Sequence, residues 1–533
     1  MNSNFKNINF LFYLLLILFA FIINTYYGNL GLFPIDSLSF FDTGYLILKE
    51  KYPVKDIWVI SGIFGDYIQA IFFSLFGLKW SSYVYHASFF NVLISISFFY
   101  LLLRKEVNIY FSFLCSLSVA TLCYPVSGTP FPYQHSFILS LISIFIFYLG
   151  VYSEEKKFWF ILPFFMIFSF LSMQMPAGII NILIILFSFI FFYIGKKNSL
   201  FGIFFSGSII ALIFLIIFFI QYEIPLYDFV EQYLLFPLSI GSARISGGEE
   251  AFAGAKLMNK FTFRGVIGHF KFINIFIIGF IVVTLNRLIL VKNFKLYFKD
   301  NLTNTFIIFC SISFIFHQLI TANQTFIFSM IPILGGFFFI QIKKNYYKNY
   351  FKFFIILIIL FTTIKYHNTY NEKRKFMDLQ NINLKNNVDA SFLDTRLKGL
   401  KWITPFYDGS PKEELEILKI TLTKLKNDNR KKMLITHYQF FSFLLETNLN
   451  IPNRWYYSEN NTYPSSEKNK YFNSYKKRFN QKLKENNIEV IYFIDSYPKE
   501  LNIDGFKKYL KKDCVIEKKI NSLTTLLELK KCF

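Results

Sequence analysis

The sequence predicts a polytopic α-helical membrane protein with about eleven spans, followed by a small C-terminal α/β domain. Three observations lead to this prediction. Hydrophobic residues make up 54% of the 533 residues, and charged residues only 17%, whereas soluble domains carry about 25% charged residues. The stretches 107–153, 158–195, 198–222 and 301–342 contain no Asp, Glu, Lys or Arg. After about residue 367 the composition shifts to Lys, Glu, Asn and Asp.

The charge-free stretches are long enough to cross a bilayer, which takes about 20 helical residues. We interpret 107–153, 158–195 and 301–342 as two spans each, because each is about twice that length. The apolar run near the N-terminus resembles a signal peptide, but no small-residue cleavage site follows, so we expect an uncleaved first span. The predicted spans are 8–27, 83–103, 107–124, 136–152, 157–173, 176–194, 200–221, 271–291, 304–320, 324–342 and 350–366.

The junctions between the predicted spans alternate between basic and uncharged. Because cytoplasmic loops retain Lys and Arg, the basic junctions and the N-terminus are expected in the cytoplasm. The alternation requires 63–78 to be an interfacial helix, and this stretch is short for a span and contains Asp66. Three larger regions then face the exterior: 28–82, 222–270 and everything after about residue 367.

This topology predicts an integral protein of a bacterial inner (cell) membrane. Residues 1–366 would form the transmembrane domain, and 367–533 an exterior, periplasmic α/β domain. The net charge of +22 does not indicate a nucleic-acid partner, because Lys and Arg in the membrane half occur at helix ends. The partner that this arrangement favours is membrane lipid.

The C-terminal region has the pattern of a small α/β domain. Ser410, Pro411 and Glu413 form a capping box that predicts a helix to about Leu425. Alternating strands and helices predict a partly parallel sheet. The expected strands are 432–437, 488–495 and 514–519, and the expected helices between them are 469–486 and 504–511.

Five cysteines occur in the chain. Three lie in or beside predicted spans, where a thiol packs as a small hydrophobe. Cys514 and Cys532 flank a predicted terminal hairpin in an oxidising compartment. The two cysteines either form a disulfide there or stay as two thiols. No Cys/His spacing indicates a metal site.

The first exterior region, 28–82, contains Asp36, Asp42, Asp56 and Asp66. Carboxylates near a membrane are costly to desolvate, so several together favour a functional hypothesis. One of them could deprotonate an acceptor hydroxyl as a general base. The structural alternative is that they cap interfacial helices, with Asp42 before the run TGYLIL as an N-cap candidate.

These residues resemble the first lumenal loop of the GT-C superfamily of glycosyltransferases. Asp36 or Asp42 corresponds to the acidic residue after the first span, and Tyr45 to the helix tyrosine. Residues 51–56 correspond to the turn of the superfamily loop, and residues 75–77 to the end of its second interfacial helix. The usual Asp-Glu pair and the turn glycine are absent. The superfamily consists of multi-span enzymes that use polyprenyl-phosphate-linked sugars.

The resemblance implies a mannosyltransferase-like enzyme that moves a sugar from a polyprenyl-phosphate donor to a glycan, lipid or protein acceptor on the exterior face. Asp36 or Asp42 would be the catalytic base. Because the donor carries its own leaving group, the resemblance implies neither a cofactor nor a metal. Folds host several functions, so this expectation depends on the site residues.

Polar residues of other exterior segments complete the predicted site. Arg244 and Arg264 would bind phosphate oxygens in a bidentate way, although basic residues at an interface also extend toward lipid headgroups. A lone interface histidine is more often structural, and polar residues at a span end can satisfy backbone groups. The predicted substrate-binding residues are Asp56, Asp66, Tyr45, His135, Arg244, Arg264, His269, His317 and Gln324.

Three other functions remain open. A polymerase or ligase of surface polysaccharide would depend on Arg and His of a later loop more than on an aspartate after the first span. A transporter would show inverted repeats and charges inside spans, and the sequence shows neither. A non-catalytic scaffold would use its C-terminal domain to bind a cell-wall component.

Overall fold

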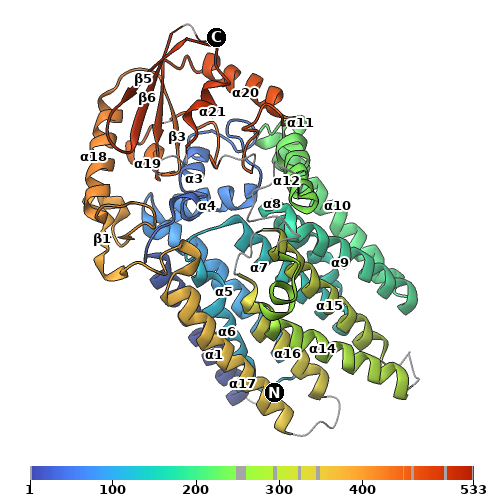
Figure 1. Cartoon of the computed structure of the whole chain (residues 1–533). Coiled ribbons are helices and arrows are strands. Elements are labelled where there is room, and N and C mark those ends of the chain that lie inside the picture. The colour runs from blue at the N-terminus through green and yellow to red at the C-terminus, as the bar shows by residue number, and fades with distance from the viewer. Residues whose placement is uncertain are drawn as a thin grey trace.

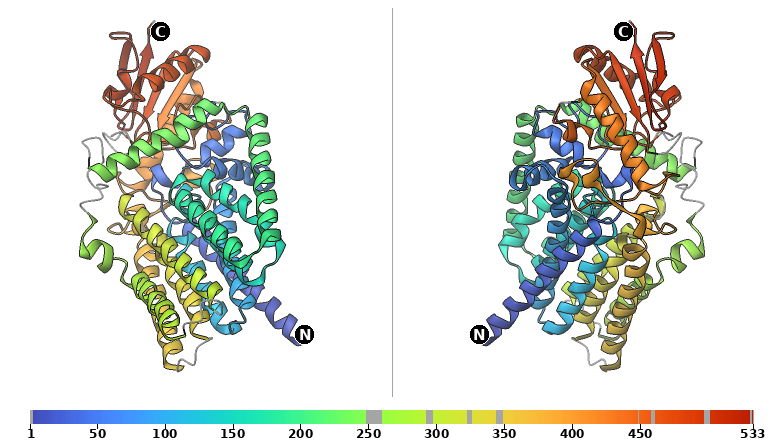
Figure 2. Two further views of the ribbon diagram at one scale, coloured as in Figure 1. Left: turned by 90° about the vertical axis from the view of Figure 1, so that its right-hand side faces the viewer. Right: turned by 90° about the vertical axis from the view of Figure 1, so that its left-hand side faces the viewer.

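A bundle of long helices carries an α/β domain at one end (Figure 1). The computed structural model describes residues 3–247, 260–291, 297–321, 326–343, 349–447, 449–457, 461–496, 501–530 and 532. The amino-terminal helix starts at the end of the bundle opposite the C-terminal domain (Figures 1 and 2).

The bundle helices form where the sequence lacks charged residues. Nine helical segments of the described chain are long and apolar enough to cross a membrane. The expected spans 157–173 and 324–342 form shorter helices, α8 with 17 residues and α16 with 14. The bundle helices are α1 (Ser3–Gly28), α5 (Trp80–Arg104), α6 (Ile109–Leu122), α7 (Pro132–Ser153), α8 (Lys156–Ser172), α9 (Gln174–Gly195), α10 (Asn198–Gln221), α14 (Lys271–Asn286), α15 (Phe298–Ile320), α16 (Met330–Lys343) and α17 (Asn349–Tyr366).

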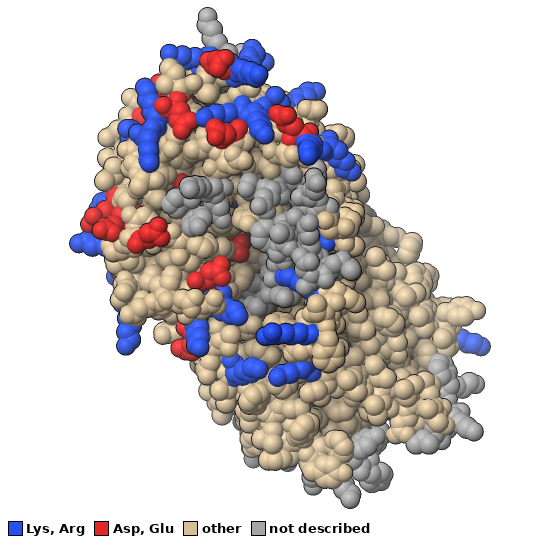
Figure 3. Space-filling model, in the orientation of Figure 1, with Lys and Arg blue, Asp and Glu red and all other residues tan. Residues whose placement is uncertain are grey.

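The outer surface of the bundle is apolar. On α10, Leu212, Ile213 and Phe214 expose 53%, 49% and 51% of their surface. Figure 3 shows charged side chains gathered over the C-terminal domain, while the flank of the bundle in view has few. A large exposed apolar surface of this kind indicates contact with a membrane. The mainly helical chain therefore has the features of an integral membrane protein, and eleven spans stay a prediction.

The two ends of the bundle differ in chemistry. At the end away from the C-terminal domain, the predicted basic junctions meet through ion pairs with Glu154 and Glu155. Lys197 and Lys299 lie 2.5 and 2.7 Å from the Glu154 carboxylate, and Arg104 pairs with Glu155. The three junctions that contribute these basic residues are therefore neighbours in space.

The other end is built from the first loop and a later helical segment. The first loop forms three short helices, α2 (Pro34–Ser37), α3 (Phe41–Ile47) and α4 (Ile63–Phe76). The helix α4 confirms the short helix expected over 63–78. The later segment is continuous through α11 (Leu226–Phe229), η2 (Val230–Leu235) and α12 (Phe236–Ser246). Tyr124–Val126 (η1) forms a turn against α1, where Gly28 approaches Gly128 so closely that a Cβ on Gly28 would lie 2.5 Å from the Gly128 oxygen.

The C-terminal domain contains the partly parallel sheet that the sequence predicts. The strand order is β3–β4–β6–β5, with β3 parallel to β4 and the other pairs antiparallel. The capping box of Ser410 and Glu413 is present. The elements are β3 (Lys432–Thr436), β4 (Val490–Ile494), β5 (Val515–Lys519), β6 (Thr524–Leu529), α18 (Pro411–Asn427), α19 (Phe441–Leu445), α20 (Phe472–Glu485), α21 (Ile503–Lys507) and a small pair, β1 (Val388–Asp389) and β2 (Lys401–Trp402).

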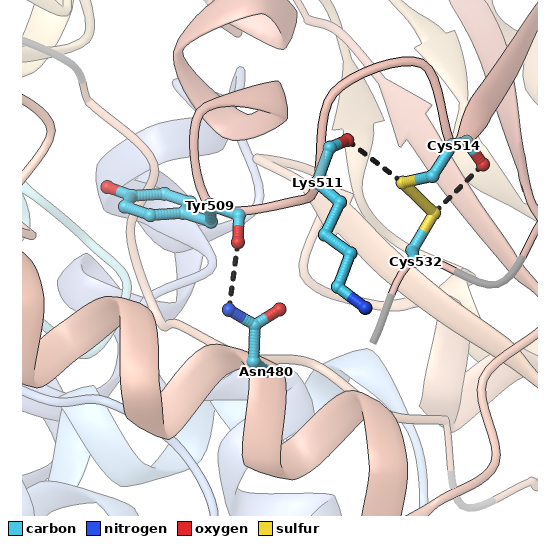
Figure 4. Close-up of a disulfide and its surroundings, with 5 residues drawn as sticks. All are labelled: Asn480, Tyr509, Lys511, Cys514 and Cys532. Carbon is cyan, nitrogen blue, oxygen red and sulfur yellow. Dashed lines mark hydrogen bonds between the residues drawn. A yellow bond between two sulfur atoms is a disulfide. The ribbon is translucent and has the colours of Figure 1, made fainter.

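A disulfide joins Cys514 to Cys532, one of the two outcomes left open by the sequence (Figure 4). It links the start of β5 to the segment after β6, so it closes the edge hairpin of the sheet. Nearby, the Asn480 side chain on α20 donates a hydrogen bond of 2.8 Å to the Tyr509 carbonyl. This contact ties the helix to the segment that precedes the hairpin.

The first loop and the C-terminal domain share one hydrophobic core. Phe41, Trp58 and Trp80 belong to the same buried cluster as Trp402 and Phe443. Backbone hydrogen bonds cross between them, including Trp58 N–H to the Pro452 carbonyl at 2.8 Å. Because burial of this apolar surface stabilises both parts together, the loop and the domain form one structural unit.

Candidate functional site

A pocket of about 500 Å³ lies between the end of the bundle and the C-terminal domain. This volume falls in the range of ligand-binding pockets, about 300–1,000 Å³. The bundle side of the pocket contains Ile60, Ser61, Met173, Thr321 and the residues discussed next, and the C-terminal domain forms the opposite side. The pocket therefore combines segments that are far apart in the sequence.

Asp36 contributes a half-buried carboxylate to the pocket. It lies in α2, which begins with Pro34 at its first turn, where the missing N–H costs nothing. The Phe33 N–H donates to the Ser37 hydroxyl at 3.0 Å, and the Ser39 hydroxyl donates to the Asp36 carbonyl at 2.6 Å. These local bonds fix the short helix and hence the position of the carboxylate.

Arg244, near the end of α12, contributes a cation to the same pocket. Its Nη1 donates to the Ile320 carbonyl at 3.3 Å, and its Nη2 donates to Asn461 Oδ1 at 3.2 Å. Its buried Nε has no partner among the described residues. Burial lowers the pKa of Arg244, but an arginine remains protonated in proteins. The Arg244 guanidinium thus places a positive charge at the pocket wall.

His317 lies directly behind this wall. Its ring stacks on Tyr133, with centroids 4.9 Å apart and planes 5° from parallel, and Tyr133 lines the pocket. Gln318 Nε2 donates to the Tyr133 hydroxyl at 2.7 Å. Both ring nitrogens of His317 are buried without a hydrogen-bond partner in the part of the chain that the structure describes. His317 therefore supports the tyrosine of the wall and keeps two unused polar atoms close to the pocket.

Asp42 has a different environment from Asp36. It is 0% exposed, and its carboxylate accepts the Ser442 N–H at 3.2 Å and the Phe443 N–H at 3.0 Å. Burial raises the pKa of Asp42 to about 7. The prediction that Asp42 caps the helix after it was wrong, because α3 begins at Phe41 and its N-cap residue is Phe40. Asp42 instead binds the first turn of α19, across the interface with the C-terminal domain.

Asp66 is also 0% exposed and lies in a buried ion pair with Arg454 of the C-terminal domain. The Thr43 hydroxyl donates to its other oxygen at 2.5 Å, and Arg454 also donates to the Ser61 carbonyl. Burial raises the pKa of Asp66 to about 7, and the Arg454 charge opposes this rise. The contact joins α4 to the C-terminal domain beside the pocket-lining Ser61.

Asp56 and Tyr45 also lie at this interface. The Asp56 carboxylate accepts the Tyr52 N–H at 2.9 Å and lies 3.3 Å from Lys482 Nζ on α20. Tyr45 is 1% exposed and packs edge-on against Phe443 at 5.9 Å. These contacts hold the first loop against the C-terminal domain, and neither residue lines the pocket.

His135 belongs to a buried polar chain inside the bundle. Its Nε2 lies 2.8 Å from His86 Nε2, and its Nδ1 lies 2.9 Å from the Tyr124 hydroxyl. His86 Nδ1 in turn lies 2.9 Å from Gln69 Oε1. His135 Nδ1 also lies 3.0 Å from the Phe131 carbonyl, so the donor and acceptor roles along this chain follow from the histidine tautomers. The chain connects α4, α5 and α7.

The remaining predicted residues do not line the pocket. Arg264 is exposed at the start of a π-helical turn, 264–268. His269 packs against Phe328 with ring centroids 5.5 Å apart, and burial lowers its pKa. Gln324 lies outside the described residues. Of the predicted site, Asp36 and Arg244 are thus brought together at one pocket, with His317 behind it.

Sequence reasoning missed the contribution of the C-terminal domain. Asp378, Trp455 and Asn461 line the pocket, and Trp455 Nε1 donates to the Ile35 carbonyl at 2.9 Å, beside Asp36. Arg374 is fully buried and donates to the Leu30, Pro125 and Ser127 carbonyls. A run of aromatic residues around Arg454 (NRWYY) was the available signal, because a surface segment rarely carries three consecutive large aromatics.

No group of three or more His, Cys, Asp and Glu side chains gathers in the described chain in a way that could hold a metal ion. No protein-family model matches the sequence, and no curated protein matches it either. The chemistry of the pocket between the bundle and the C-terminal domain is therefore the basis for assigning a function.

Proposed function

We propose that this chain is an integral membrane glycosyltransferase of the GT-C type. It moves a sugar from a polyprenyl-phosphate donor to an acceptor on the exterior face of the membrane. The observation that carries the proposal is that Asp36 and Arg244 line one pocket at the end of an apolar helical bundle. A carboxylate and an arginine are the two groups that this transfer needs.

The charge distribution of the bundle supports an exterior pocket. Lys197, Lys299 and Arg104 form ion pairs at the end away from the C-terminal domain. Lys and Arg are retained in cytoplasmic loops, so this end is the cytoplasmic one in the proposal. The pocket and the C-terminal domain then lie on the periplasmic side of the inner membrane, where lipid-linked sugars are accessible from the bilayer.

The proposed reaction uses the two groups on opposite ends of the transferred sugar. Asp36 accepts the proton of the acceptor hydroxyl, and the hydroxyl oxygen attacks the anomeric carbon. The bond between that carbon and the phosphate oxygen breaks, and the electron pair stays on the lipid phosphate. Arg244 holds this phosphate and stabilises its increased charge with charge-assisted hydrogen bonds. No further cofactor enters the proposal, because the donor supplies its own leaving group.

Asp36 is a better candidate for the base than Asp42. A general base must reach the hydroxyl directly or through one water. Asp36 lines the pocket, whereas Asp42 is fully buried and already accepts two backbone N–H groups. The pKa of Asp42, raised to about 7 by burial, would suit a base. An acceptor hydroxyl cannot reach the Asp42 carboxylate, however, because the side chain is fully buried.

The test is sugar transfer from synthetic polyprenyl-phosphate donors in proteoliposomes. Asp36→Asn should lower kcat at least about a hundredfold, the usual contribution of a general base. Asp42→Asn is the matched control, expected to retain transfer in the fraction of protein that folds. Arg244→Ala should weaken binding of the donor, which would be measured as a raised KM for the donor. Full transfer by a folded Asp36→Asn variant would remove Asp36 from the mechanism, and no transfer from a broad donor panel would overturn the proposal.

A polymerase or ligase of surface polysaccharide is the second candidate. The observation that favours it is the approach of His317 to the pocket through Tyr133, together with Arg244 at the wall. That function depends on Arg and His more than on Asp36. Loss of activity in Arg244→Ala and His317→Ala, with Asp36→Asn unchanged, would select it over the transferase.

A further inference from the structure

The C-terminal domain supplies one complete wall of the pocket. This wall consists of Asp378, Phe406, Trp455, Tyr457, Asn461 and Thr462. It contains aromatic rings, a carboxylate, an amide and two hydroxyls, and no Lys or Arg. The cation Arg244 comes from α12 and meets this wall at Asn461, where its Nη2 donates to Asn461 Oδ1 at 3.2 Å. The C-terminal residues and the α12 arginine therefore suit different chemical groups.

Trp455 presents an apolar ring surface to the pocket. Its only polar group, Nε1–H, is already used by the Ile35 carbonyl at 2.9 Å. The Arg454 guanidinium lies 5.1 Å from its ring centroid, which fixes the indole further. Of the five tryptophans in the chain, the other four are at most 2% exposed, whereas Trp455 is partly exposed. A rigid ring with no free donor binds a ligand through its π face.

Polar groups beside the ring have unused hydrogen-bonding capacity. Asn461 accepts from Arg244 through Oδ1 at 3.2 Å, and its NH₂ group makes no hydrogen bond within the described residues. The Asp378 carboxylate accepts no hydrogen bond from a described residue, and burial raises its pKa. An amide that donates and a carboxylate that accepts, in one pocket with an aromatic face, match a ligand with an apolar face and hydroxyls at its edge.

We infer that this wall binds the acceptor and that the acceptor is a saccharide unit. A pyranose ring has the required shape, since its C–H groups form an apolar face and its hydroxyls radiate from the rim. The inference rests on the proposed transferase function and adds the chemical class of the acceptor. A sugar stacked on Trp455 shares the pocket with Asp36, and Arg244 from α12 is left for the donor phosphate.

Binding can be measured without any transfer reaction. The full-length protein in lipid nanodiscs, which avoid sugar-headgroup detergents, is titrated with methyl glycosides of glucose, galactose, mannose and N-acetylglucosamine. At least one glycoside should change tryptophan emission saturably, because Trp455 is the only partly exposed tryptophan. Trp455→Phe should abolish the fluorescence change while ligand-observed NMR still detects binding, because the aromatic face is kept.

Two variants and a control test the wall itself. Trp455→Ala should weaken saccharide binding at least tenfold, about 1.4 kcal/mol, and Asp378→Asn should weaken it without changing the emission spectrum of the free protein. Phe392→Ala removes an aromatic ring that is 36% exposed on the same domain but does not line the pocket. This control should bind saccharides like the native chain.

The outcomes separate the inference from the proposed function. Saccharide binding that depends on Trp455, with no transfer from any donor, would support the wall and overturn the transferase. Transfer to lipid or peptide acceptors, with no saccharide bound by the native chain, would overturn the saccharide inference and leave the transferase standing. If Trp455→Ala raises the KM of the lipid-linked donor and not that of the acceptor, the assignment of this wall to the acceptor is wrong.

Discussion

The buried ion pair between Arg454 and Asp66 provides a quantitative test of how the C-terminal domain is held. Both side chains are 0% exposed. Arg454→Met keeps most of the side-chain volume and removes the charge, which leaves the Asp66 carboxylate buried beside only the Thr43 hydroxyl. Removing one partner of a buried pair costs about 3–5 kcal/mol. Native proteins have only about 5–15 kcal/mol of stability, so this single change should remove a large share of it.

The assay is chemical denaturation in nanodiscs, followed by tryptophan fluorescence. The matched control is Arg430→Met in the same domain. Arg430 also binds two carboxylates, Asp428 at 2.8 Å and Glu528 at 3.0 Å, but 38% of its side chain is exposed. An exposed pair contributes about 0–1 kcal/mol. The two arginine variants should therefore differ by at least about 2 kcal/mol in the free energy of unfolding.

A double variant separates the charge from the packing. Arg454→Met combined with Asp66→Leu leaves no unpaired charge, and apolar replacement of a buried pair is often neutral or stabilising. The double variant should recover most of the stability that Arg454→Met loses. If Arg454→Met destabilises the protein no more than Arg430→Met, water reaches the pair and the described interface does not exist in solution.

Three further predictions concern the C-terminal domain and its contact with the first loop. Burial raises the pKa of Asp42 to about 7, above about 4 for an unfolded aspartate. The folded chain therefore binds a proton that the unfolded chain releases, and the free energy of unfolding should fall by up to about 4 kcal/mol as pH rises from 4 to 7. The urea midpoints at pH 4 and pH 7 should differ less for Asp42→Asn than for the native chain. Ser410→Ala should cost about 1 kcal/mol by removing a helix cap, and Ser410→Asn, which can still cap, should not. Replacing Cys514 and Cys532 by serine should cost about 3 kcal/mol, and a reducing agent should then have no further effect on the melting temperature.

Local patterns in the sequence predicted local structure well. The capping box at Ser410, the strand at 488–495 and the short helix at 63–78 each depend on a few neighbouring residues, and each is present. The sequence alone does not predict the strand β6 (Thr524–Leu529), because half of its side chains are polar or charged. Its pairing with β4 and β5 stabilises it in the fold.

The candidate site was predictable only in part. Asp36 and Arg244 were singled out by residue type and by their place near a membrane surface. The aromatic run around Arg454 (NRWYY) indicates burial, but it does not reveal that Asp66 is the partner of Arg454. The contact of Trp455 with Ile35 joins residues 420 positions apart, so no local pattern predicts it. Such contacts are set by the whole fold.

The shared core of the first loop and the C-terminal domain has a consequence for biosynthesis. Asp42 binds backbone groups 400 and 401 residues further along the chain. At about 5–20 residues per second, the ribosome needs about 20–80 s to make the intervening chain. During that time the loop lacks the strands and helices that later cover Phe41, Trp58 and Trp80. A segment made early therefore stays incomplete until a segment made about 400 residues later covers it, so the core of this unit closes only late in synthesis.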